Sequence, residues 1–175
     1  MHADLLEQAE SLARLDLRGA PRQANLRRAV SSTYYALFHY LVDESCRAII
    51  GTQHSQQGYR HALARSFVHT TMKSACGSFG GGQLPDTIVK SLPKDQNGKY
   101  AVAAAIQNIS SLFKEVQLKR HLADYDLSER FQRFEVLALI QHVDQHIQAF
   151  SAVPQSNDRQ FFLISLLTWK ELANR

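Results

Sequence analysis

Cysteine and long apolar runs are scarce in this sequence, and each scarcity excludes a class of protein. The 175 residues include two cysteines, Cys46 and Cys76, too few for a disulfide-stabilised scaffold. We expect both to be buried thiols. No apolar stretch approaches the roughly 18 residues that span a membrane. The N-terminal segment is amphipathic and acidic, unlike a signal peptide. We therefore expect a cytoplasmic protein that is not bound to a membrane.

Acidic residues are scarce in the middle of the chain. Residues 18–120 contain 14 Lys and Arg against 5 Asp and Glu, whereas the formal net charge of the whole chain is +4. A basic segment of this kind attracts phosphate groups. An ordinary solvated surface on a basic protein has the same composition. Charge alone therefore leaves both interpretations open.

Strand patterns are nearly absent, whereas apolar residues recur at helical spacing along most of the chain. The pattern predicts one helix over about 3–16 and a second that begins at Pro21 and ends at a cap at Gly51. A third and a fourth helix are predicted over about 59–76 and 99–124. A fifth begins after a cap at Asp126 or Ser128, and a sixth begins after a cap at Asp158. Tyr59 and Phe134 are among the apolar side chains predicted to be buried.

These segments predict an all-α fold: an up-and-down helical bundle of five or six helices. The stretch 77–98 contains several glycines and prolines, and we expect it to be a flexible loop within one domain covering 1–175.

The helix predicted after Pro21 has an apolar and a polar stripe. The apolar stripe comprises Leu26, Val30, Thr33, Leu37 and Leu41. The polar stripe comprises Arg28, Ser32, Tyr35 and His39. Such hydrogen-bond donors suit phosphate and ribose. A polar seam inside the bundle or at a dimer contact explains the same pattern. We expect a homodimer, because the polar stripe would otherwise face solvent.

Basic side chains recur every four residues in the helix predicted over 59–76. They are His61, Arg65, His69 and Lys73. This spacing places them along one face of a continuous helix. The face is either a track for phosphates or a solvated basic surface.

Polar side chains also gather at the end of the helix predicted over 99–124, where Gln117, Arg120, His121 and Asp124 are three or four residues apart. A guanidinium beside an imidazole stabilises a phosphorane-like charge and moves a proton. Alternatively, Asp124 pairs with Arg120 along the helix.

His142 and His146 are four residues apart, a spacing that suits a shared metal ion. The glutamate of a zinc protease motif is missing, and no third ligand is evident. We therefore predict neither a metal site nor a cofactor.

Two segments of the chain together follow a known pattern. Arg27-Arg28-Ala29, followed by Tyr34-Tyr35-Ala36-Leu37-Phe38-His39, resembles the first long helix of the HEPN family (higher eukaryote and prokaryote nucleotide-binding). Arg120-His121-Leu122-Ala123-Asp124-Tyr125 resembles its later Arg-x-x-Ala-Asp-Tyr segment. The resemblance covers roughly residues 22–150.

The resemblance implies a helical bundle that dimerises by pairing polar helices across a shared cleft. Many members of the family are metal-independent endoribonucleases of toxin–antitoxin or antiviral defence systems. Others bind nucleotides or act as partners of a small nucleotidyltransferase. Catalytic members carry an arginine, four to six further residues and then a histidine.

This sequence has Tyr125 where that histidine would fall, and a phenol is a poor general base at neutral pH. We therefore expect an RNA- or nucleotide-binding module of a prokaryotic toxin–antitoxin or defence system, with a nucleotidyltransferase or an antitoxin as its partner. The alternative is a metal-independent endoribonuclease that uses Arg120 and a nearby histidine.

The predicted site residues fall into a catalytic group and a binding group. The catalytic group is Arg120, His121 and Tyr125. The RNA- or nucleotide-binding group is Arg28, Ser32, Tyr35, His39, Arg65, His69, Lys73 and Asp124. We expect Arg28, His39 and Arg120 to meet in a single cleft.

Overall fold

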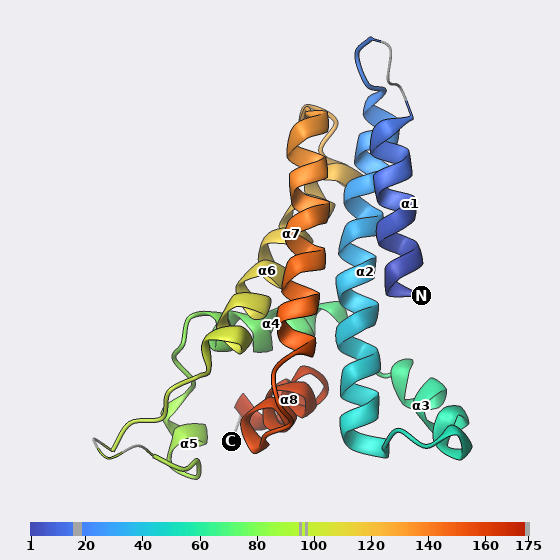
Figure 1. Ribbon diagram of the computed structural model, residues 1–175. Coiled ribbons are helices and arrows are strands. Elements are labelled where there is room, and N and C mark those ends of the chain that lie inside the picture. Colours follow the sequence, from blue (N-terminus) through green and yellow to red (C-terminus); the bar gives the residue numbers. More distant parts are fainter. Residues whose placement is uncertain (16–18, 95, 97, 174–175) are drawn as a thin grey trace. The chain divides into compact units, whose positions relative to one another are not determined.

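The computed structural model describes residues 1–15, 19–94, 96 and 98–173, and this part of the chain is all-α. The predicted fold class, an all-α helical bundle, is confirmed (Figure 1). The described residues form eight α-helices and one short 3₁₀-helix rather than five or six helices. Asp16, the predicted end of the first helix, lies outside the described residues. In the described part of the chain, every helix is too short or too polar to cross a bilayer.

The helices pack into two compact units, each assembled from two separate stretches of the chain. Unit 1 comprises Met1–Tyr40 and Leu112–Ser151. Unit 2 comprises Leu41–Ser111 and Ala152–Arg175. The expectation of one domain over 1–175 stays a prediction, and each unit is described by itself.

Unit 1 consists of four helical segments that run in alternating directions (Figure 1). They are α1 (His2–Arg14), the first part of α2 (Gln23–Ile50), the last part of α6 (Ala104–Tyr125) and α7 (Arg133–Ser151). The predicted apolar stripe of α2 is fully buried at Leu26, Val30, Thr33 and Leu37, and at Leu41, the first residue of unit 2. Burial of each large apolar side chain contributes about 1.5–3 kcal/mol, so this stripe anchors α2 in the core.

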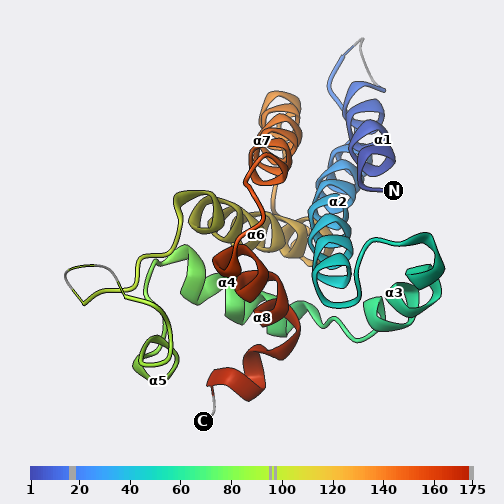
Figure 2. The ribbon, with the colours of Figure 1, turned by 60° about the horizontal axis from the view of Figure 1, so that its bottom comes forward.

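Unit 2 contains the end of α2, the start of α6 and several shorter helices. They are the 3₁₀-helix His54–Gln56, α3 (Gln57–Ala64), α4 (His69–Gly80), α5 (Asp86–Val89) and α8 (Asn157–Ala173). Helices α4 and α8 lie side by side (Figure 2). Between them, the ring of Phe79 lies 5.1 Å from that of Phe162 and 5.8 Å from that of Trp169.

The start of α8 is fixed by polar contacts within unit 2. The buried Arg159 donates to Glu44 Oε2 at 2.7 Å and to the carbonyl of Val153. The predicted cap at Asp158 is wrong, because Ser156 Oγ accepts the backbone N–H of Arg159. Asp158 Oδ1 instead accepts the hydroxyl of Tyr100 at 3.1 Å. Burial and this carboxylate raise the pKa of Tyr100 to about 12.

The single helix predicted over 59–76 is wrong, because α3 ends at Ala64 and α4 begins at His69. Between them, Val68 adopts an extended backbone conformation with φ −117° and ψ 128°. This break turns Phe67 into the protein interior, whereas Tyr59, which was expected to be buried, is 70% exposed. Apolar spacing continues across the break and conceals it in the sequence.

The predicted cap at Gly51 is confirmed, since its φ of +107° favours glycine and its N–H donates to the carbonyl of Arg47. Part of the predicted loop 77–98 is helical, because α4 runs to Gly80 and α5 lies within it.

Both cysteines are buried, as predicted. Burial, followed by the charge of Asp43, raises the pKa of Cys46 to about 11, so its thiol is protonated near neutral pH.

The close approach of α4 to α6 depends on Gly80. A Cβ atom there would lie 3.0 Å from the backbone nitrogen of Ser111 and 2.8 Å from its Oγ. We expect Gly80→Ala to lower the free energy of unfolding by about 1–3 kcal/mol, measured by urea denaturation.

Gly77 on the same helix is the matched control, because a Cβ there has no neighbour within 4 Å. Gly77→Ala should raise the free energy of unfolding by about 0.5–1 kcal/mol through helix propensity. Equal stability of the two variants would contradict the proposed close contact.

Candidate functional site

Arg120 lies near the end of α6 and faces α2 within unit 1. Its Nε is 2.6 Å from Asp124 Oδ2, and its Nη2 donates to the hydroxyl of Tyr35 at 3.4 Å. The guanidinium carbon is 5.8 Å from the centre of the Tyr35 ring and 5.6 Å from that of Tyr125. Both distances suit cation–π interactions. One carboxylate and two phenol rings therefore hold the guanidinium.

Asp124 is held in turn by α2. Ser31, which is buried on α2, donates from Oγ to Asp124 Oδ1 at 2.6 Å. The side chains of Arg120 and Asp124 remain 26% and 28% exposed. The ion pair is therefore fixed by neighbouring groups and is still accessible from solvent.

The charge of Arg120 is permanent in this environment. Burial lowers the pKa of Arg120, but the carboxylate of Asp124 and the phenols of Tyr35 and Tyr125 outweigh it, and the net pKa is raised. The site presents a cation whose charge is partly compensated by a single carboxylate.

Two imidazoles flank the two phenols. The ring of His39 stacks on that of Tyr35, with centroids 6.2 Å apart, and the exposed His121 lies 5.0 Å from the ring of Tyr125. Burial, followed by the charge of the N-terminal amine, lowers the pKa of His39. His39 is therefore neutral at physiological pH, the state required of a general base.

Arg27 holds the end of α6 in place. Its Nη1 donates to the carbonyls of Leu122 and Ala123, and its Nη2 donates to those of Asp126 and Glu129 at 2.8 and 2.7 Å. Carbonyls at the end of a helix lack partners within that helix and carry partial negative charge. One guanidinium therefore caps part of this end of α6 and fixes the following turn.

The turn between α6 and α7 has its own fixed geometry. The side-chain amide of Gln23 donates from Nε2 to the carbonyl of Phe131 at 2.9 Å. Its Oε1 accepts a hydrogen bond from the backbone N–H of Phe131 at 3.0 Å. Asp126 Oδ1 accepts the N–H and hydroxyl of Ser128, and these bonds lower the pKa of Asp126.

The predicted α7 cap at Asp126 or Ser128 is wrong, because the helix begins only at Arg133. Glu135 closes its first turn by accepting the backbone N–H of Gln132 at 3.3 Å.

The remaining predicted residues make none of the contacts described here for Arg120. Arg28 is exposed on α2, whereas Ser32 is buried and donates to Gln8 of α1 at 3.3 Å. The other three residues, Arg65, His69 and Lys73, belong to unit 2. Arg65 directly follows α3, whereas His69 and Lys73 lie on α4. They do not share one helix face.

Sequence reasoning missed two residues of the site, Arg27 and Ser31. Each is adjacent to a residue of the same type that was chosen instead, Arg28 or Ser32. A signal existed in Leu26 and Val30, the buried residues that precede them. A side chain next to the apolar stripe reaches the neighbouring helix more readily than one beyond it.

The histidine pair of α7 makes a local contact. The rings of His142 and His146 lie 4.3 Å apart, and His146 Nδ1 is 2.9 Å from the carbonyl oxygen of His142. Within the described residues, His, Cys, Asp and Glu side chains form no group of three or more that suits a metal ion.

Comparisons of the chain with models of protein families, with curated proteins and with solved structures found no match.

Arg27 should be essential for stability because lysine cannot reproduce its fork of four hydrogen bonds. We expect Arg27→Lys to lower the free energy of unfolding by about 2–3 kcal/mol in urea denaturation. Arg28→Lys is the matched control, since Arg28 is exposed, and it should change stability by less than about 0.5 kcal/mol. Comparable losses in the two variants would contradict the role assigned to Arg27.

His39 should make stability depend on pH. The unfolded chain binds this proton more tightly than the folded chain, because folding lowers the pKa of His39. The contribution of neutral His39 to the free energy of unfolding is therefore fully present above the pKa of about 6.5 in the unfolded chain. It is lost as the pH decreases through the pKa of His39 in the folded protein. Urea denaturation between about pH 7.5 and 5.5 should show this loss, and His39→Gln should reduce it. An unchanged pH profile in His39→Gln would assign the loss to other groups.

Proposed function

We propose that Ser31, Tyr35, Arg120, Asp124 and Tyr125, here called the Arg120 cluster, bind a phosphate-containing ligand, either RNA or a nucleotide. The observation that carries this proposal is the partly exposed guanidinium between two tyrosine rings, one of which, Tyr125, is 65% exposed. An exposed aromatic ring beside a fixed cation is the combination with which proteins bind a base and its phosphate.

The contacts of Arg120 leave donors for a phosphate. A guanidinium has five N–H donors, of which Nε lies against Asp124 and one Nη2 donor points to Tyr35. The other Nη donors suit paired phosphate oxygens. Asp124 keeps the fork in one orientation, which reduces the entropy lost on binding.

The resemblance to HEPN proteins supports the same assignment. Arg120, Asp124 and Tyr125 belong to the segment resembling the Arg-x-x-Ala-Asp-Tyr motif, and Tyr35 belongs to the segment resembling the first long helix. On this basis we assign the chain to a prokaryotic toxin–antitoxin or defence system. There it acts as a cytoplasmic homodimer, with a nucleotidyltransferase or an antitoxin as its partner.

A metal-independent endoribonuclease is the second candidate function. The observation that favours it is the neutral His39 stacked on Tyr35, whose hydroxyl accepts the Arg120 hydrogen bond. A neutral imidazole removes a proton from a ribose hydroxyl, and a guanidinium stabilises the charge that develops on phosphate. Exposed His121, next to Tyr125, is the other imidazole available for this role.

Binding of a fluorescent single-stranded RNA, followed by anisotropy, tests the proposal. We expect Arg120→Gln to weaken binding at least about tenfold, and the affinity of the unmodified protein to fall steeply between about 50 and 200 mM salt. Tyr125→Ala should weaken binding by a similar factor, whereas Tyr125→Phe should retain most of it because the stacking ring remains.

Arg47→Gln is the matched control. Arg47 forms an ion pair of the same spacing with Asp43, with a distance of 2.8 Å, on the exposed surface of α2. Equal losses in Arg47→Gln and Arg120→Gln would show that only total charge matters and would contradict the assigned site.

Incubating the protein with structured RNA in the presence of EDTA separates the two candidate functions. Cleavage lost in both Arg120→Gln and His39→Gln supports the nuclease, and intact bound RNA supports the binding module.

A further inference from the structure

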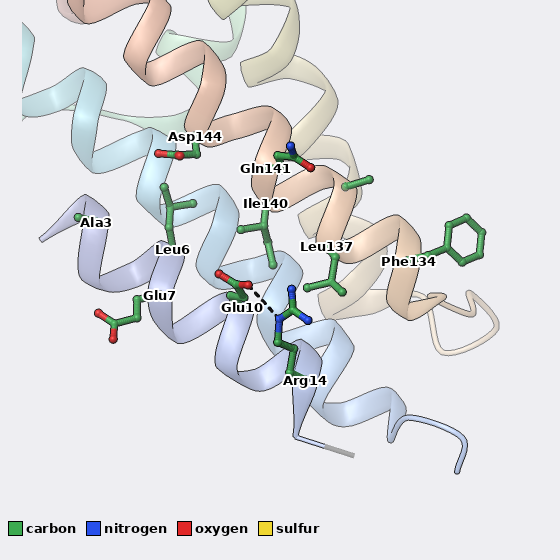
Figure 3. A pocket seen from close by; sticks show the side chains of 11 residues that line it. Ala3, Leu6, Glu7, Glu10, Arg14, Phe134, Leu137, Ile140, Gln141 and Asp144 are labelled. Atoms are coloured by element: carbon green, nitrogen blue, oxygen red, sulfur yellow. Dashed lines mark hydrogen bonds and ion pairs between the residues drawn. The ribbon is translucent and has the colours of Figure 1, made fainter. Parts of the chain in front are cut away.

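An open groove between α1 and α7 lies within unit 1 and has a volume of about 760 Å³. Its floor includes the buried Leu6 of α1 and Ile140 of α7, with Leu137 beside them. Figure 3 shows these aliphatic side chains between the two helices, with Glu7 on the outer side of α1. The groove therefore has an apolar floor between two helical walls.

One end of the groove exposes a large aromatic side chain. Phe134 falls on the helical spacing that predicts burial, and yet it is 71% exposed. Phe131, three residues earlier, is buried beneath the guanidinium of Arg27 instead, 5.8 Å from its ring centre. An exposed phenylalanine beside an apolar groove is typical of a binding surface.

The rim of the groove carries negative charge. Arg14 is neutralised by Glu10, its partner at 2.9 Å. Glu7 of α1 and Asp144 of α7 are at the rim, and within the described part of the chain neither pairs with a lysine or an arginine. The groove therefore attracts a ligand that combines apolar and positively charged groups.

We propose that this groove binds a basic amphipathic helix of a partner protein. The apolar side chains of that helix fill the groove from Leu6 to Phe134, and its lysines or arginines meet Glu7 and Asp144. This mode, a helix laid into a groove, uses apolar anchors at three- and four-residue spacing. It concerns a different surface of unit 1 from the Arg120 cluster and does not depend on the proposed RNA binding.

The dimensions and charges of the groove favour this occupant. Its lining residues run from Ala3 to Arg14 on α1, about 16 Å of helix at 1.5 Å per residue. That length matches about three turns of a bound helix. If a second copy packed groove against groove, Glu7 and Asp144 of one copy would meet, among the lining residues, only the cation of Arg14 of the other copy. Glu10 already neutralises that arginine. A partner with its own cations fits better.

The experiment uses the full chain and a synthetic probe. The probe is a fluorescent, helix-forming peptide of about 12 residues, with leucines at three- and four-residue spacing and lysines elsewhere. We expect anisotropy to show a Kd of tens of micromolar or tighter, weakened at least about tenfold in Phe134→Ser and in the double variant Glu7→Lys with Asp144→Lys. The same peptide with glutamates in place of its lysines should not bind.

Leu118→Ser is the matched control, because it removes an exposed apolar side chain, 56% exposed on α6, away from the groove. It should leave peptide binding unchanged. The proposal is overturned if the basic peptide does not bind, if the acidic peptide binds equally well, or if Leu118→Ser weakens binding as much as Phe134→Ser does. Light scattering that shows a dimer abolished by Phe134→Ser would also overturn it, by assigning the groove to self-association.

Discussion

The hydrogen bonds from Arg27 to four carbonyls are the constraint on which the rest of unit 1 depends. They fix the end of α6 against α2. One turn along α2, Ser31 holds Asp124, and Asp124 holds Arg120. A further turn along, Tyr35 accepts a hydrogen bond from Arg120. The candidate site is therefore an extension of the same seam that closes the helix end.

The sequence pattern predicts polar contacts along this face of α2 but places two of them one residue away. The pattern points to Arg28 and Ser32, whereas the contacts with α6 are made by Arg27 and Ser31. Each step of four residues advances about 40° around a helix beyond a full turn, so a face that meets a crossing helix drifts along its length. Adjacent residues of identical type differ in the sequence only in their distance from the apolar stripe, which is shorter for Arg27 and Ser31. The contacts with the partner helix show which of the two residues is used.

The helical periodicity was sufficient for the fold class but not for two local features. Apolar spacing passes without interruption through Val68, where the backbone is extended and the chain divides into α3 and α4. The same spacing predicts burial of Phe134, which is exposed because Phe131 fills the interior beside Gln23 and Arg27. In both places tertiary packing overrides a local pattern, and the pattern alone contains no record of the competing side chain.

The uneven charge of the chain acquires a physical meaning from the two proposed surfaces of unit 1. The basic segment supplies Arg27 and Arg120 on α2 and α6, whereas the acidic ends supply Glu7 and Asp144 on α1 and α7. The acidic groove repels phosphates, whereas the Arg120 cluster has no excess of negative charge to attract a basic helix, because Arg120 and Asp124 compensate each other. On the two proposals, the ligands therefore bind at different surfaces. On these proposals, a single small helical unit holds a phosphate ligand and a basic partner at the same time.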